Sequence, residues 1–167
     1  DEWIVRAIRR AAPDKRWRAD ANAAWTLDEA KRMAAFLAEQ GCELIEQPLP
    51  PDDLDGLREL TRDSPIPVIA DESCRSAADI PRLDGVVSGI NIKLSKCGGL
   101  AQARRMALEA AGRGMLVMLG CMVESSLGIS AMAQLAPLAN FADLDGAALL
   151  SDDPFTGVSI EDGMVRL

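Results

Sequence analysis

The sequence contains no histidine among its 167 residues. This absence excludes Ser-His-Asp and Cys-His nucleophile systems, zinc sites with histidine ligands and histidine general bases. Acid–base chemistry must therefore come from carboxylates, lysines or cysteines. The four cysteines form no Cys-x-x-Cys pair, which argues against a zinc ribbon or a thioredoxin-type site. Their small and apolar sequence neighbours are typical of buried free thiols in a reducing compartment.

Further absences concern binding partners and location. Positive charge is not in excess, because 18 Lys plus Arg face 26 Asp plus Glu, and this balance argues against a nucleic-acid-binding function. No apolar run approaches the roughly 18 residues that a membrane span needs. Residues 1–17 lack the long apolar stretch of a signal peptide. The sequence therefore predicts a cytoplasmic protein that binds neither nucleic acid nor membrane.

What is present is a regular alternation of short β-type runs and helical stretches. The expected strands are 17–19, 43–45, 67–70, 89–92, 116–119 and 140–142. The expected helices are 2–12, 27–40, 53–61, 76–83, 100–111 and 125–138. Strands separated by crossover helices predict an α/β fold with a parallel sheet.

A polar side chain follows each of the first four strand runs. These residues are Asp20, Glu46, Asp71 and Lys93, and they recur at intervals of about 25 residues. One such residue at the end of each successive strand is how a TIM (β/α)8-type barrel builds its active site, whereas an open sheet gathers them at one switch point. A complete barrel has eight strands, so we expect a partial barrel with about six βα units and without the first two strands.

Three carboxylates, Asp20, Glu46 and Asp71, lie at consecutive strand ends and can converge on one point. Oxygen ligands without nearby histidine or cysteine suit Mg²⁺, with Mn²⁺ as an alternative, better than zinc. Acidic residues after strands also cap helices, which is the competing interpretation for Asp20 and Asp71. Glu46 stands before Gln47-Pro48, where a helix cap is not expected. The register of all three favours a metal site.

Two further positions bear polar groups with alternative explanations. Lys93 follows the strand run 90–92, so its ammonium must either pair with a carboxylate or act as a base. Asp143 and Asp145 follow the sixth run, and two carboxylates one residue apart on a strand project to the same side. They are suited to hold a substrate ammonium group. A turn or cap pair before Gly146 is the alternative for them.

The sequence resembles the enolase superfamily from about residue 16 onward, and within it the muconate-lactonizing-enzyme subgroup. The motifs that carry the resemblance are Asp-Ala-Asn at 20–22, Glu-Gln-Pro at 46–48, Asp-Glu-Ser at 71–73, Asn-Ile-Lys at 91–93 and Gly-Gly at 98–99. The stretch 141–146, Phe-Ala-Asp-Leu-Asp-Gly, is similar to the Asp-x-Asp motif of dipeptide epimerases. The resemblance is closest to L-Ala-D/L-Glu epimerases, which implies a part in peptidoglycan recycling.

The resemblance implies a mechanism. A Mg²⁺ ion on Asp20, Glu46 and Asp71 would bind the terminal carboxylate of a small dipeptide substrate. Removal of the adjacent α-proton would give an enediolate, with Lys93 acting as the base on one face. Asp143 and Asp145 would hold the free α-ammonium. We expect residues 1–167 to be the C-terminal part of such a barrel domain, without the family's N-terminal capping domain.

One departure from the family pattern affects the expected activity. The family has a second catalytic lysine on the strand before the first metal ligand, and this chain has Lys15-Arg16-Trp17-Arg18 there instead. The chain alone is therefore expected to be inactive as an epimerase. Two alternatives stay open: another enzyme of the subgroup, a cycloisomerase or acid-sugar dehydratase, and a non-catalytic truncated fragment. The dipeptide preference and the oligomeric state are also open, and an oligomer is compatible with the sequence.

Overall fold

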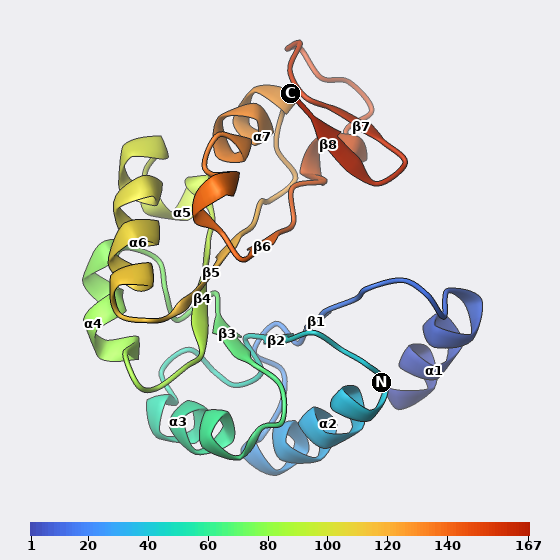
Figure 1. Ribbon diagram of the computed structural model, residues 1–167, viewed down its shortest axis with the longest axis vertical. Coiled ribbons are helices and arrows are strands. Elements are labelled where there is room, and N and C mark those ends of the chain that lie inside the picture. Colours follow the sequence, from blue (N-terminus) through green and yellow to red (C-terminus); the bar gives the residue numbers. More distant parts are fainter. The chain divides into compact units, whose positions relative to one another are not determined.

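The computed structural model describes residues 1–167, which divide into two compact units (Figure 1). Unit 1 comprises residues 1–73 and 85–88, and unit 2 comprises residues 74–84 and 89–167. Both units repeat a parallel strand followed by a helix, as the sequence predicts. None of the helices is long and apolar enough to cross a membrane.

Unit 1 contains three parallel strands, with β2 paired to β1 on one side and to β3 on the other. Helices α2 and α3 pack against each other and lie on the same side of these strands (Figure 1). Its elements are α1 (Glu2–Ala11), β1 (Ala19–Asp20), α2 (Leu27–Glu39), β2 (Ile45–Glu46), α3 (Leu54–Asp63) and β3 (Val68–Ala70).

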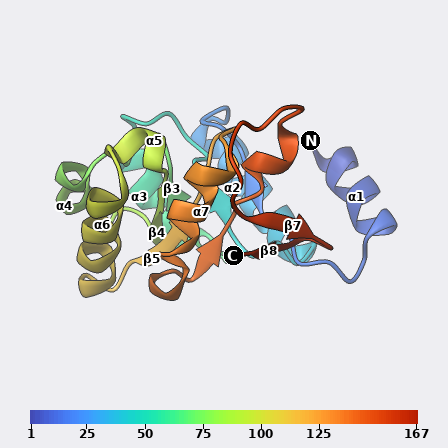
Figure 2. The ribbon, with the colours of Figure 1, turned by 90° about the horizontal axis from the view of Figure 1, so that it is seen from above.

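Unit 2 contains the parallel strands β4, β5 and β6, with β5 in the middle. Helix α6 packs against both β4 and β5, next to α4 (Figure 2). The α-helices and strands of unit 2 are α4 (Ile80–Leu83), β4 (Gly89–Ile92), α5 (Leu94–Cys97), α6 (Leu100–Gly112), β5 (Leu116–Leu119), α7 (Ser126–Ala133), β6 (Phe141–Ala142), β7 (Ser159–Glu161) and β8 (Met164–Arg166). Three short 3-10 helices are Ala77–Asp79, Ala136–Leu138 and Gly146–Leu149.

Local sequence signals explain where the main helices begin and end. Thr26 accepts a hydrogen bond from the Glu29 N–H, and the Glu29 carboxylate accepts one from the Thr26 N–H, so a complete capping box starts α2. Gly41 follows α2 at φ +76°, a left-handed conformation that glycine adopts without steric cost. Asp53 caps α3 by accepting the Gly56 N–H at 2.9 Å.

Strands β2, β3 and β4 belong to the core of their units because their residues are buried on both faces, whereas β1 and β6 are partly exposed. Ile45 and Ile69 are fully buried in unit 1, as are Ile90 and Ile92 in unit 2. Parallel strands covered by helices have this continuous apolar character. Glu46, Asp71 and Lys93 therefore lie at the ends of well-packed strands.

Two predicted helices are shorter in the structure than the sequence suggests. The expected helix 125–138 ends at Ala133 and is followed by a 3-10 helix, because Pro137 lacks an N–H and restricts Ala136. The expected helix 76–83 is likewise divided into a 3-10 helix and α4, with Pro81 in the first turn of α4.

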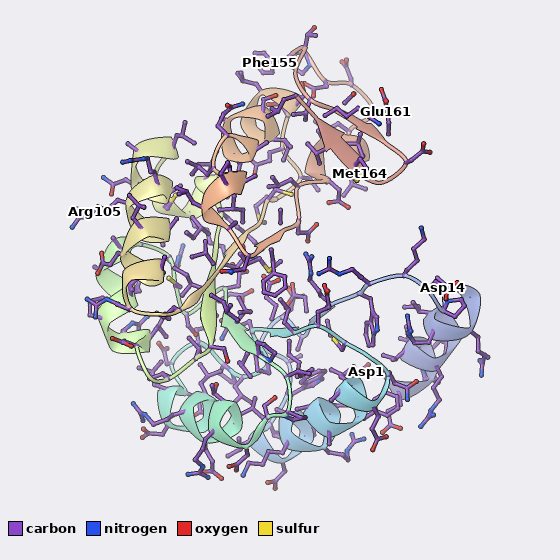
Figure 3. The ribbon with its side chains drawn as sticks, in the orientation of Figure 1. Asp1, Asp14, Arg105, Phe155, Glu161 and Met164 are labelled. Carbon is purple, nitrogen blue, oxygen red and sulfur yellow. The ribbon has the colours of Figure 1, made fainter.

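The antiparallel hairpin of β7 and β8 was not predicted. Asp162 and Gly163 connect its strands with φ of +52° and +75°. An Asp-Gly pair with two positive φ values is the turn that two-residue hairpins favour, so the signal was present in the sequence. Figure 3 shows Glu161 and Met164 on this hairpin, where Glu161 also pairs with Arg166 at 3.1 Å.

All four cysteines are free thiols, in agreement with the sequence analysis, but only two are buried. Cys42 and Cys74 lie in the interior, and burial raises the pKa of the Cys42 thiol. Cys97 and Cys121 are partly exposed, which corrects the expectation that all four are buried.

Candidate metal-binding and substrate-binding residues

The three predicted metal ligands all lie in unit 1, at the carboxyl ends of neighbouring parallel strands. Asp20 and Glu46 are the last residues of β1 and β2 and are register partners. Glu46 is also opposite Ile69, and Asp71 follows Ile69 by two residues just beyond the end of β3. Side chains in register on parallel strands project from the same face. The strand register therefore brings all three carboxylates to one end of the unit.

These carboxylates differ in burial. Glu46 is 5% and Asp71 3% exposed, whereas Asp20 is exposed. The neighbouring Glu72 has a buried carboxylate oxygen, Oε2, without a hydrogen-bond partner. Buried carboxylates are costly unless a cation or a hydrogen bond compensates them. The donor chemistry at this end of unit 1 thus fits a hard divalent cation.

The three carboxylates do not form a complete metal coordination site in this structure. No group of three acidic or cysteine side chains in residues 1–167 is arranged so that it could hold a metal ion as it stands. The strands that carry the three carboxylates nevertheless stand in register.

Backbone strain is concentrated beside the same strand ends. Asn22, Ala23 and Gln47 have φ of +47°, +59° and +32°, although none is glycine. Such conformations cost about 1–3 kcal/mol each and persist where surrounding contacts determine them. They are frequent at functional sites. No glycine stands at these three positions, so the sequence pattern does not predict the positive φ values.

Lys93 lies in unit 2, immediately after β4, and is partly exposed. Asn91, two residues earlier on the same face of the strand, is 1% exposed. Its amide packs against Gly120 at the end of β5, where a Cβ atom would stand only 2.5 Å from Asn91 Oδ1. Lys93 is thus carried by a closely packed pair of strand ends.

Asp143 and Asp145 also lie in unit 2, but not on a strand as predicted. Strand β6 ends at Ala142, and Asp145 has helical backbone angles at the start of a 3-10 helix. The alternation of side chains along a strand is therefore not the reason why Asp143 and Asp145 face the same cavity. Both are exposed while Leu144 between them is buried, and both line one cavity of about 510 Å³. The cavity has an otherwise largely apolar lining.

Cys121 lies beside this Asp-x-Asp segment. Burial, together with the negative charges of Asp143, Asp145 and Glu124, raises the pKa of the Cys121 thiol, so the thiol stays protonated at neutral pH. Glu124 Oε1 accepts a hydrogen bond from the Met122 N–H at 3.0 Å. Three carboxylates thus lie near the Cys121 thiol, and their negative charge is complementary to a cationic group.

Comparison with known proteins identifies the family. The family model described as "Enolase C-terminal domain-like" matches residues 1–167. The chain belongs to this family. It is 47% identical to the L-Ala-D/L-amino acid epimerase of Maribacter sp. over 166 residues, which covers 99% of this chain and 49% of the relative. The chain spans about half the length of the curated relatives it matches.

Solved structures of the family have the same fold. An L-Ala-D/L-Glu epimerase is similar with a TM-score of 0.90 and 39% identity, over 98% of this chain and 51% of that chain. A dipeptide epimerase from Enterococcus faecalis V583, complexed with Mg and the dipeptide L-Leu-L-Tyr, has a TM-score of 0.91 and 41% identity, over 95% and 47%. The predicted class is confirmed: an α/β fold with six parallel strands of a partial TIM barrel.

Proposed function

We propose that residues 1–167 are the C-terminal barrel portion of a dipeptide epimerase that inverts the α-carbon next to a dipeptide's terminal carboxylate. The observation that carries the proposal is the placement of Asp20, Glu46 and Asp71 at one end of three parallel strands in register. The relatives' activities support it. An L-Ala-D/L-Glu dipeptide is the proposed substrate, and the proposal includes a cytoplasmic location and a role in peptidoglycan recycling.

Each group has a distinct role in the proposed reaction. Asp20, Glu46 and Asp71 would hold a Mg²⁺ ion, which supplies positive charge that makes the substrate's α-proton more acidic. Lys93 would take or return this proton on one face of the α-carbon. Asp143 and Asp145 would hold the α-ammonium through charge-assisted hydrogen bonds, which are stronger than neutral ones.

Inversion needs a second base on the opposite face of the α-carbon. The chain contains four lysines, at positions 15, 31, 93 and 96. Lys15 is exposed in the segment before β1, and Lys31 pairs with Glu59 at 2.5 Å on the helix surface. Lys96 is partly exposed in α5, past the end of β4. We therefore propose that Lys93 is the single base of this chain, which can exchange an α-proton but does not by itself invert the carbon.

The test begins with the intact mass of the native polypeptide, since 17.9 kDa is the mass of residues 1–167 alone. That polypeptide is then incubated with L-Ala-L-Glu and Mg²⁺ in D₂O, and the glutamate α-proton is followed by NMR. Loss of the α-proton signal is expected. The epimerised dipeptide is expected only if the native polypeptide is longer than residues 1–167 and supplies a second base. Absence of exchange with any dipeptide tested would overturn the proposal.

Asp143→Ala distinguishes this proposal from a cycloisomerase or a dehydratase of the same family. We expect this variant to lose exchange of the dipeptide α-proton, because the substrate's ammonium loses its partner. An unchanged rate of exchange would contradict the proposed role of Asp143.

A further inference from the structure

Gln47 stands next to Glu46 and connects it to the strand end that bears Asp71. Its Oε1 atom accepts hydrogen bonds from the backbone N–H groups of Asp71 at 2.9 Å and Ser73 at 3.1 Å. The Gln47 side chain is fully buried. One side-chain oxygen therefore fixes the backbone on both sides of residue 72.

The Nε2 atom of Gln47 completes the network. It donates to the Leu49 carbonyl oxygen at 2.9 Å and to Ser73 Oγ at 2.9 Å. Ser73 Oγ in turn donates to the Pro51 carbonyl oxygen at 3.0 Å. These partners fix the orientation of the amide, since backbone N–H groups need an acceptor and carbonyl oxygens need a donor. A glutamate or methionine at position 47 cannot make this set of bonds.

The main chain of Gln47 joins the remaining strand ends. Its N–H donates to the Ile69 carbonyl oxygen at 2.8 Å, and its carbonyl oxygen accepts the Ala23 N–H at 2.7 Å. Ala23 and Gln47 are two of the residues with positive φ. These contacts hold both residues in their strained conformations. Gln47 thus contacts the segments that follow all three carboxylate-bearing strands.

Asp20 and Asp71 differ in which acceptor binds the backbone N–H two residues later. Asp20 Oδ1 accepts the N–H of Asn22, two residues later, at 2.8 Å, as in an Asx turn. The residue two positions after Asp71 is Ser73, and its N–H donates a hydrogen bond to Gln47 Oε1. The Asp71 carboxylate therefore does not engage in the same local turn, and its backbone is held by another strand.

We infer that Gln47 is a positioning residue for the proposed metal ligands, because its buried amide sets the backbone of Asp71 relative to Glu46. The inference rests on the proposed function. Groups that orient metal ligands without touching the metal typically change metal affinity about 10- to 100-fold when they are mutated. Gln47→Met keeps a similar side-chain length and removes every side-chain hydrogen bond.

The experiment measures Mn²⁺ affinity by electron paramagnetic resonance titration of the native polypeptide, without substrate. Gln47→Met is expected to bind Mn²⁺ about tenfold or more weakly. Ser73→Ala removes the two hydrogen bonds of the Ser73 hydroxyl, with Gln47 Nε2 and with the Pro51 carbonyl oxygen, and leaves the Gln47 Oε1 contacts. A smaller loss of affinity, roughly twofold to fivefold, is therefore expected. Gln134→Met, the same change at an exposed helix end in unit 2, is the matched control and should leave the affinity unchanged.

Urea unfolding separates positioning from a purely structural role. Affinities are compared well below each variant's unfolding midpoint, and if Gln47→Met does not fold, the Ser73→Ala titration decides. Lower stability with unchanged Mn²⁺ affinity in both variants would overturn the inference and leave the proposed function intact. An unmodified protein that binds no Mn²⁺ would overturn the proposed metal site, and the inference with it.

Discussion

Asp20 and Glu46 are register partners at the ends of two adjacent parallel strands. Two like charges placed side by side repel each other, and a cation between them removes this repulsion. Neutralising one of these two charges should therefore raise the stability of the metal-free protein and weaken metal binding.

Asp20→Asn should stabilise the metal-free protein by a few tenths of a kcal/mol, because it removes the repulsion with Glu46. The same variant should bind Mn²⁺ more weakly, because one charged ligand is lost. Urea unfolding without metal and a Mn²⁺ titration measure the two effects. Asp14→Asn, a change at an exposed loop residue (Figure 3), is the control. Unchanged Mn²⁺ affinity in Asp20→Asn would exclude Asp20 as a ligand.

Lys93→Met should abolish exchange of the substrate α-proton, since the variant keeps the length of the side chain and loses the base. A positioned acid–base group contributes about 10²- to 10⁴-fold to rate, so a loss of this size is expected. Deuterium exchange of L-Ala-L-Glu measures it. Lys31→Met, on the surface of α2, should exchange at the unmodified rate. Equal rates in the two variants would contradict a catalytic role for Lys93.

Neutralising the Asp-x-Asp pair should raise KM selectively for substrates with a free ammonium group. Asp143→Asn combined with Asp145→Asn is expected to raise KM for L-Ala-L-Glu roughly tenfold to hundredfold, because hydrogen bonds to a charged group are lost. The N-acetylated dipeptide has no ammonium group, so its already weak binding should change little. A parallel loss for both substrates would indicate a general distortion of the loop rather than loss of a charge pair.

The ends of the first four strand runs were predictable because each shows a local pattern, in which a charged residue follows the run at once. β4 and β5 have the predicted bounds, and β1 and β2 differ by one or two residues. The Asp143–Asp145 backbone was not predicted correctly, since the residue at which pairing with β5 stops depends on tertiary contacts. The role of Gln47 was also inaccessible, because its partner Ser73 lies 26 residues later in the chain.

The Asp153 side chain links the C-terminal segment of unit 2 to the start of α7. Asp153 Oδ2 accepts the Ser126 N–H at 2.6 Å, and Oδ1 accepts the Phe155 N–H at 3.0 Å. The hydrogen bond from Ser126, followed by that from Phe155, lowers the pKa of Asp153. A carboxyl group whose pKa is lower in the folded than in the unfolded state stabilises the fold above its unfolded-state pKa, which is about 3.9. This contribution is lost as the pH falls through the folded-state pKa.

Asp153→Asn should therefore have a lower urea midpoint than the unmodified protein at pH 7, and the difference should shrink below about pH 4. Amide hydrogen exchange at Ser126 and Phe155 should be faster in the variant at neutral pH, because both N–H groups lose a charged acceptor. Asp152→Asn, at the exposed neighbouring position, is the control for a change of net charge. A difference that stays constant from pH 7 to pH 3 would mean that the Asp153 side chain stabilises this segment by its shape and not by its charge.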